Sequence, residues 1–253
     1  MSRKFWTPDA RHFLWIVVVA LSSTACADDP ARSDYPDAPA NVLFVGNSFM
    51  YYNNSLHNHY RALVRSSGHI FEPPPVTRSM TISGAHLPDH EAGLAGMLGT
   101  EDWDVVILQG HSLGPIGEST AEPFREAARH YSTLVREHGG RPVFFMTWAY
   151  TGKPEMTSQL DAAYTGIGRE LAAQVVPVGL AFATVIDARP DIVLRIADAL
   201  HPTLAGTYLA ACTFFATLLN RSPEGFEYSA GLDAEVAAYL QKVAWQTVLS
   251  YRD

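Results

Sequence analysis

The sequence predicts a three-layer α/β/α sandwich built on a parallel sheet of about five strands. Five short apolar runs are typical of buried strands, and stretches with helical spacing lie between them. Parallel strands need long crossover connections, and strands covered on both faces carry apolar residues without alternation. The predicted strands are 42–45, 76–80 (the weakest), 105–108, 143–146 and 175–178.

Composition and charge narrow the class of protein. Hydrophobic residues make up 47% of the 253 residues and charged residues 17%, which excludes a disordered tail, a coiled coil and a collagen-like fibre. The formal net charge is −8, and no block of Lys and Arg interrupts it, so we expect no nucleic-acid partner. No apolar run reaches the roughly 20 residues that span a bilayer.

Residues 1–26 predict an export signal. Basic residues precede an apolar run over 13–21, and the small residues 22–25 lead to Cys26. Nine apolar residues are too few for a membrane span but suit the hydrophobic region of a secretory signal. The terminal cysteine indicates a bacterial lipoprotein signal, in which Cys26 is acylated and becomes the mature N-terminus. Plain secretion, with cleavage after Ala27, is the alternative.

Residues 27–40 mix Asp, Pro and Ala without apolar periodicity, so we expect a disordered tether. The predicted folded domain covers residues 41–253. We therefore expect an exported protein of the cell envelope, which contacts the membrane only through its N-terminal lipid anchor. Without the lipid it would be periplasmic or secreted.

Helical spacing recurs in the rest of the chain, and the last such stretch carries a stripe of apolar residues every three to five positions. In open parallel sheets, ligands bind beyond the carboxyl ends of the strands, so the residues directly after each strand are the candidates for function. The predicted helices are 123–137, 157–173, 204–219 and 234–251.

Gly46, Asn47 and Ser48 follow the first strand. Gly46 permits a sharp turn, and Ser48 stands where a helix would begin and where unpaired backbone N–H groups favour negative charge. Such a serine can be a nucleophile whose own amide stabilises an oxyanion, or it can be a helix N-cap.

Asp198 and His201 lie three residues apart, just before a helical run that starts at Leu204. An Asp at this distance can orient the imidazole, fix its tautomer and stabilise the imidazolium ion. The alternative is a surface Asp beside a structural His. The pair indicates a catalytic role only in combination with Ser48.

These segments, VLFVGNSF and DALHPTLAGTYLAA, resemble the first and last sequence blocks of the SGNH (GDSL-type) hydrolases, which are esterases and acetylesterases. The resemblance implies that the parallel sheet is flavodoxin-like. Asn47 stands where that family most often has Asp. The resemblance implies Ser48 as the nucleophile, His201 as the base and Asp198 as the orienting acid. It also implies an oxyanion hole formed by the backbone N–H groups of Ser48 and Gly84.

The third block departs from the family, which has Gly-x-Asn-Asp after the third strand. The segment here is VVILQGHSLGP, without Asn. Some carbohydrate-esterase-like members carry a Gln in this region, so the resemblance implies Gln109 as the side-chain oxyanion donor, with Ser112 second. An amide side chain fits the role because the chemistry needs only a preorganised N–H or O–H.

A rival motif covers residues 110–114, Gly-His-Ser-Leu-Gly, which matches the G-x-S-x-G nucleophile elbow of α/β-hydrolases. That elbow passes straight into a helix, whereas Pro115 and Gly117 follow here. The acid and His of that fold also come from separate loops. A Ser112 nucleophile remains an alternative.

Other residues near predicted strand ends are weaker candidates. His86 and His90 have the spacing of two metal ligands on a helix, but a proline lies between them, and we expect neither metal nor organic cofactor. Aromatic residues in these regions, including Tyr51, Tyr52 and Trp148, could stack on a sugar or pack in the core.

The sequence as a whole predicts an exported serine ester hydrolase of the carboxylic ester class. Its expected substrate is an acylated carbohydrate or another small ester. The alternatives are a lipase or esterase with a Ser112 nucleophile, and a noncatalytic binding lipoprotein of the cell envelope.

Overall fold

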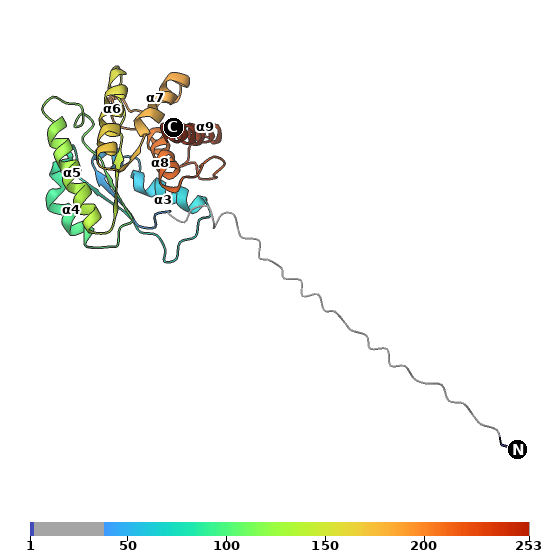
Figure 1. The fold of residues 1–253 in the computed structure, drawn as a ribbon. Coiled ribbons are helices and arrows are strands. Elements are labelled where there is room, and N and C mark those ends of the chain that lie inside the picture. Colours follow the sequence, from blue (N-terminus) through green and yellow to red (C-terminus); the bar gives the residue numbers. More distant parts are fainter. Residues whose placement is uncertain (3–37, 253) are drawn as a thin grey trace.

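Five parallel strands form one sheet in the computed structural model, in the order β2-β1-β3-β4-β5 (Figure 1). The structure describes residues 1–2 and 38–252. Helices cover both faces, so the predicted three-layer sandwich with a five-stranded parallel sheet is confirmed. The strands are β1 (Val42–Gly46), β2 (Thr77–Thr81), β3 (Val105–Leu108), β4 (Arg141–Phe145) and β5 (Gln174–Val176).

The predicted export signal at 1–26, including Cys26, and the tether up to residue 37 lie outside the described residues and stay predictions. In the part of the chain that the structure does describe, no helix has the length and apolar character needed to cross a membrane.

Alternate residues of each central strand enter two separate hydrophobic cores. In β1, Leu43 and Val45 face one core, while Val42 and Phe44 face the other. Because both faces are covered, every residue of β1 is buried, which explains why the strand is an unbroken apolar run.

The first core lies under α3 (Leu56–Ser66), α7 (Val178–Ala188), α8 (Leu204–Leu219) and α9 (Ala234–Arg252). The second lies under α4 (Glu91–Leu98), α5 (Ala121–Glu137) and α6 (Glu155–Glu170), on the opposite side of the sheet in Figure 1. Two short helices complete the domain, α2 (Ser48–Tyr51) directly after β1 and the 3₁₀ turn η1 (Leu87–His90).

The fifth strand is shorter than predicted. β5 ends at Val176, because Pro177 has φ −83° and ψ 50°, outside the extended region, and α7 begins at Val178. The expectation that the strand continues to residue 178 was therefore wrong, although its position in the sheet was not.

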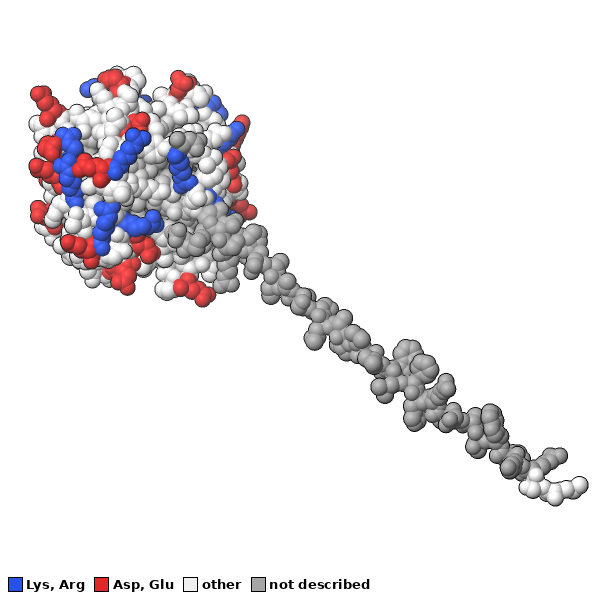
Figure 2. Space-filling model, in the orientation of Figure 1, with Lys and Arg blue, Asp and Glu red and all other residues white. Residues whose placement is uncertain are grey.

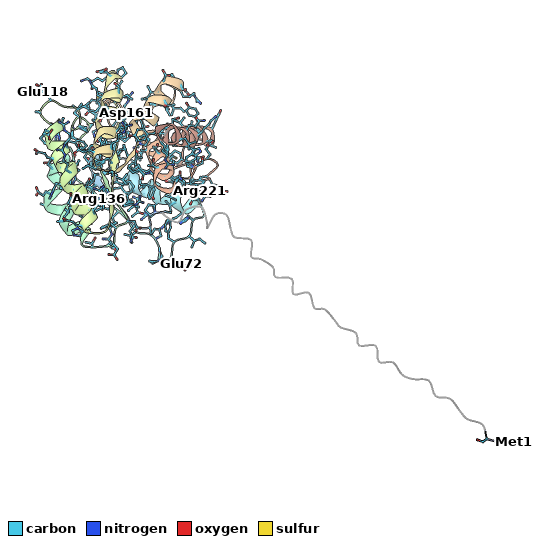
Figure 3. All side chains as sticks on the ribbon, viewed as in Figure 1. Met1, Glu72, Glu118, Arg136, Asp161 and Arg221 are labelled. Atoms are coloured by element: carbon cyan, nitrogen blue, oxygen red, sulfur yellow. The ribbon has the colours of Figure 1, made fainter. Side chains whose placement is uncertain are left out.

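All five strands run in one direction, so their carboxyl ends meet at one edge of the sheet. Figure 3 labels Glu118, in the loop that follows β3, at the end of the domain opposite Glu72, which precedes β2. Figure 2 shows acidic and basic side chains mixed on the viewed face. Ion pairs include Arg129–Glu170, which joins α5 to α6 at 2.5 Å. The site described next lies at the carboxyl edge.

Candidate active site

The turn after β1 presents the Ser48 side chain at the start of α2. Asn47, not Ser48, is the N-cap, because its side-chain oxygen accepts a hydrogen bond from the Phe49 N–H at 3.1 Å. The Ser48 hydroxyl is thereby left out of the capping interaction. It lies instead 2.8 Å from His201 Nε2.

Ser48, His201 and Asp198 form one continuous line of hydrogen bonds. On the far side of the imidazole, His201 Nδ1 lies 2.6 Å from Asp198 Oδ2. A carboxylate only accepts, so Nδ1 carries the proton and Nε2 is free to accept the proton of Ser48. The structure thus brings together the three residues that the sequence singled out.

The carboxylate of Asp198 is held by the loop that it shares with His201. Its Oδ1 accepts hydrogen bonds from the backbone N–H groups of Leu200 at 3.0 Å and His201 at 2.9 Å. Burial by itself raises the pKa of Asp198, but the hydrogen bonds from Leu200 and from His201 outweigh it and lower that pKa below its ordinary value. Asp198 is therefore an anion wherever the site works near neutral pH.

Aromatic rings fix the imidazole of His201. Tyr52 stacks on it with 4.5 Å between ring centroids and 11° between planes, and Phe49 meets it edge-on at 5.7 Å. Trp148 is 1% exposed, stacks on Phe49 and donates from Nε1 to the Leu200 carbonyl at 2.9 Å. Of the aromatic candidates, Trp148 is thus a core residue that supports the loop carrying Asp198 and His201, called the base loop below. Tyr51 is 39% exposed.

Gln109 lies behind the turn that carries Ser48. Its side chain is 0% exposed, its Oε1 accepts from the Asn47 N–H at 3.2 Å, and its Nε2 donates to Asn47 Oδ1 at 2.7 Å and to the Gly110 carbonyl at 3.2 Å. Both amide hydrogens are therefore used within the protein. This contradicts the expected role of Gln109 as an oxyanion donor. Gln109 instead holds the turn that carries Ser48, through its hydrogen bonds to Asn47.

Gly84 lies in the exposed loop that follows β2 and has a left-handed φ of 65°. Asn47 Nδ2 donates to the carbonyl of the next residue, Ala85, at 3.1 Å, which ties this loop to the nucleophile turn. Within residues 38–252, the backbone N–H groups of Ser48 and Gly84 have no hydrogen-bond acceptor. Neither group is therefore used in a hydrogen bond within this part of the chain.

Ser112 does not sit on a nucleophile elbow. Residues 112–116 form turns, and α5 begins only at Ala121, so no helix follows the serine directly. The side chain is 3% exposed, and its hydroxyl is hydrogen-bonded to the Tyr150 hydroxyl. The structure contradicts the α/β-hydrolase alternative, because the imidazole of His201 pairs with Ser48 instead.

The histidines near the site do not gather around a common point. His86 stacks on His111 at 4.5 Å, while His90 is 1% exposed and neither of its ring nitrogens has a hydrogen-bond partner in the described chain. Burial lowers the pKa of His90, and nearby Asp89 and the backbone of Gly46 oppose that shift only in part. Among residues 1–2 and 38–252, no group of three or more His, Cys, Asp or Glu could hold a metal ion.

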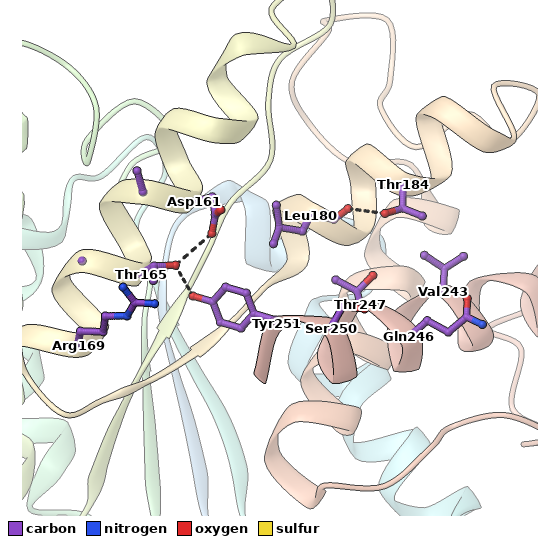
Figure 4. Close-up of a pocket in the computed structure, with 12 residues that line it drawn as sticks. Asp161, Thr165, Arg169, Leu180, Thr184, Val243, Gln246, Thr247, Ser250 and Tyr251 are labelled. Atoms are coloured by element: carbon purple, nitrogen blue, oxygen red, sulfur yellow. Dashed lines mark hydrogen bonds between the residues drawn. The ribbon is translucent and has the colours of Figure 1, made fainter. Parts of the chain in front are cut away.

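A large cavity of about 830 Å³ lies elsewhere, between α6, α7 and α9 (Figure 4). Thr165 on its wall donates to Asp161 at 3.1 Å and is hydrogen-bonded to the Tyr251 hydroxyl at 2.6 Å. None of Ser48, Asp198 and His201 lines it, so this cavity is separate from the candidate site.

Comparisons with known proteins give relatives by structure only. No protein-family model and no curated protein matches the sequence. A DUF4886 family protein from Bacteroides uniformis superposes with a TM-score of 0.65 at 21% identity, covering 83% of this chain and 94% of that one. A candidate SGNH hydrolase from Slackia heliotrinireducens gives 0.59 at 25% identity, covering 70% and 98%.

An acetylxylan esterase from Geobacillus stearothermophilus gives a TM-score of 0.57 at 15% identity, covering 74% of this chain and 95% of that one. The chain therefore has the α/β fold of the SGNH hydrolases, a five-stranded parallel sheet with flanking helices. The identities are low, so the comparisons bear on the fold, and function rests on the site itself.

Proposed function

We propose that this protein is a serine ester hydrolase of the SGNH type, with Ser48 as nucleophile, His201 as general base and Asp198 as the acid that orients the base. The observation that carries the proposal is the line of two hydrogen bonds, 2.8 Å from Ser48 Oγ to His201 Nε2 and 2.6 Å from His201 Nδ1 to Asp198 Oδ2. Serine, imidazole and carboxylate in this order are the parts of an acyl-transfer triad.

The first half of the reaction makes an acyl-enzyme. His201 Nε2 takes the hydroxyl proton as Ser48 Oγ attacks the ester carbonyl, and Asp198 stabilises the resulting imidazolium. When the tetrahedral intermediate collapses, the C–O bond to the alcohol breaks and His201 returns the proton to that oxygen. In the second half, His201 takes a proton from water as the water oxygen attacks the acyl carbon. The bond from the acyl carbon to Ser48 Oγ then breaks, and His201 returns the proton to that oxygen.

The oxyanion of the intermediate would be stabilised by the backbone N–H groups of Ser48 and Gly84. Both lie in segments that Asn47 joins, and both lack a protein acceptor in the described range. Backbone donors fixed in this way need no rearrangement during the reaction. Because Gln109 uses its amide hydrogens elsewhere, the proposal needs no side-chain donor from β3.

The proposed substrate is a carboxylic ester, and an acylated carbohydrate is the class that we favour. Support comes from the acetylxylan esterase among the structural neighbours, together with the partly exposed ring of Tyr51 at the end of the nucleophile helix. Tyr51 could stack on the face of a sugar.

The location is a further part of the proposal. An exported protein, held in the cell envelope by a lipid on Cys26, fits the order of basic, apolar and small residues in 1–26. Detergent-phase partitioning of the chain tests it. Cys26→Ser should release the protein from the membrane or block its processing, and a mature N-terminus at Asp28 would instead indicate plain secretion.

Hydrolysis of p-nitrophenyl acetate, combined with a fluorophosphonate that labels activated serines, tests the enzymatic function. We expect turnover by the purified chain and a single label that mass spectrometry maps to Ser48. A noncatalytic binding lipoprotein would show neither. A screen of acetylated sugars against simple acyl esters then separates the substrate classes.

A further inference from the structure

Three consecutive residues between the nucleophile helix and α3 have positive φ angles, a range that favours glycine. Asn53, Asn54 and Ser55 have φ of 52°, 67° and 68°, and none of them is glycine. Residues other than glycine rarely have positive φ angles. Three such residues in a row therefore persist only where neighbouring groups hold the backbone in place. The turn lies between α2, which begins at Ser48, and α3.

A buried histidine of α3 holds the turn from behind. His59 is 3% exposed, and its Nε2 lies 2.6 Å from the Asn53 carbonyl oxygen. Since a carbonyl only accepts, Nε2 carries the proton, and Nδ1 accepts from the Tyr228 hydroxyl at 2.8 Å. Ser55 adds a hydrogen bond from its hydroxyl to the Met50 carbonyl at 3.1 Å.

The side chain of Asn53 points from this turn to the loop that carries the base. Its Nδ2 donates to the Pro202 carbonyl at 2.9 Å and to Thr207 Oγ1 at 2.8 Å. Pro202 directly follows His201, and Thr207 lies in the first turn of α8. One amide group therefore joins the nucleophile segment to the base loop, 149 residues away in the chain.

We propose that Asn53 is a positioning residue that fixes the relative placement of Ser48 and His201, an inference that rests on the proposed function. The left-handed turn, held by His59, aims both amide hydrogens of Asn53 at the far segment. The residue before it, Tyr52, stacks on the imidazole at 4.5 Å. The same turn thus sets the position of the base loop and covers one face of the ring.

Asn53→Asp is the sharpest test. Asp has the same shape and also tolerates left-handed conformations, but its carboxylate cannot donate to the Pro202 carbonyl. Asn54→Asp is the matched control, since it makes the same change at the adjacent left-handed residue, whose side chain has no hydrogen bond within the described chain. Both variants carry the added charge at a residue with positive φ, residue 53 being half-buried and residue 54 exposed. The effect of the charge itself is removed in Asn53→Gly, described below.

For Asn53→Asp in the full-length chain we expect kcat to fall on the order of 10- to 100-fold, because a shift of about 1 Å at a reacting pair costs as much as 10²-fold. KM should change less than about twofold, since the substrate contacts stay in place. Fluorophosphonate labelling of Ser48 should slow by the same factor as kcat. Asn54→Asp should stay within about twofold of the wild type in all three measurements.

Asn53→Gly is the second variant, and it keeps the test decisive if the aspartate variant unfolds. Glycine accepts the left-handed conformation without strain, so the chain should fold while the amide group is lost. A kcat loss in Asn53→Gly, measured well below its melting temperature, supports positioning. A lower melting temperature with unchanged kcat and labelling in both Asn53 variants would show a purely structural role and overturn the proposal.

The NMR signal of the proton on His201 Nδ1 separates this inference from the proposed function. If the wild type neither turns over esters nor takes the fluorophosphonate, the proposed function fails, yet this signal still reports how the imidazole sits against Asp198. We expect it to shift or broaden in Asn53→Gly and to stay unchanged in Asn54→Asp. An unchanged signal in Asn53→Gly would overturn the positioning role on its own.

Discussion

Asn47 and Gln109 exchange two hydrogen bonds across the ends of the neighbouring strands β1 and β3. Gln109 Oε1 accepts from the Asn47 N–H at 3.2 Å, and Gln109 Nε2 donates to Asn47 Oδ1 at 2.7 Å. The same Asn47 oxygen caps the helix that begins at Ser48. The pair therefore holds the turn by which the chain leaves β1 and reaches Ser48. Its loss should lower the stability of the fold more directly than it lowers the rate of the reaction.

Gln109→Ala should destabilise the protein by about 2–4 kcal/mol. The substitution leaves a cavity, and it leaves buried polar groups of Asn47 without hydrogen-bond partners. Urea unfolding measures the change, with Gln246→Ala on the exposed face of α9 as the control. Unchanged stability together with a 10²- to 10³-fold loss of turnover would instead point to an oxyanion donor.

Gly46→Ala should disturb the same pair from the other side. A Cβ at residue 46 would lie 2.3 Å from Gln109 Oε1 and 2.9 Å from Met50 Sδ, closer than real contacts allow. We expect a loss of about 1–3 kcal/mol, as for other overpacked cores, together with lower activity. Gly96→Ala in α4 is the control, since its Cβ would meet nothing within 4 Å. There the substitution should be neutral or stabilising in thermal unfolding.

The two candidate serines should differ sharply in an ester-hydrolysis assay. Ser48→Ala removes the proposed nucleophile and should lower kcat by about 10³-fold or more, and His201→Ala should match it because the residues act as a unit. Ser112→Ala removes only the hydrogen bond to Tyr150 and should cost at most about 10-fold. A dead Ser112→Ala beside an active Ser48→Ala would refute the proposed triad.

The sequence predicted the sheet and the polar groups at its carboxyl edge, because these depend on local patterns. Continuous apolar runs marked β1 and β3, and the spacing of Asp198 and His201 placed both on one loop. The role of Gln109 could not be predicted, since whether an amide faces the substrate or a neighbouring backbone depends on tertiary packing.

Two helices of the first core were not predicted from the sequence. In α3, the buried residues Leu56, Tyr60, Leu63 and Val64 do follow helical spacing, so a signal was present. In α7, the helix starts within an apolar run that also fits a strand, and periodicity alone does not separate the two. The left-handed turn at 53–55 had no signal of its own, because Asn and Ser are common in ordinary loops.

Protonation of His90 should make the fold sensitive to acid. Burial lowers its pKa in the folded state below the ordinary value of about 6.5, so between these two values the unfolded chain binds the proton and the folded chain does not. Protonation of His90 therefore has no effect on the free energy of unfolding above pH ~6.5. Below that pH, the free energy of unfolding falls as the pH drops toward the folded-state pKa.

His90→Leu should remove that part of the acid sensitivity, measured as the change in unfolding free energy between pH 8 and pH 5. At pH 8 the variant should be as stable as the wild type or more so, because both ring nitrogens are buried without partners. His130→Leu, at an exposed position of α5, is the matched control. Equal acid sensitivity in the wild type and His90→Leu would contradict the assignment.

Asp198→Asn should reduce kcat by about 10²- to 10⁴-fold while leaving Ser48 and His201 in place, because an amide favours the wrong tautomer of the imidazole.

The same variant tests the pH dependence of stability. The hydrogen bonds from Leu200 and His201 lower the pKa of Asp198 in the folded protein. The carboxylate therefore stabilises the fold above its unfolded-state pKa of about 3.9, and this stabilisation is lost as the pH falls through the folded-state pKa. The difference in stability between wild type and variant should therefore shrink only below pH ~4. Activity of the wild type depends on a different group, since a base must be neutral to take the serine proton. A pH–rate profile beside unfolding measurements separates the two effects, and a loss of activity that follows the stability curve would exclude an imidazole base.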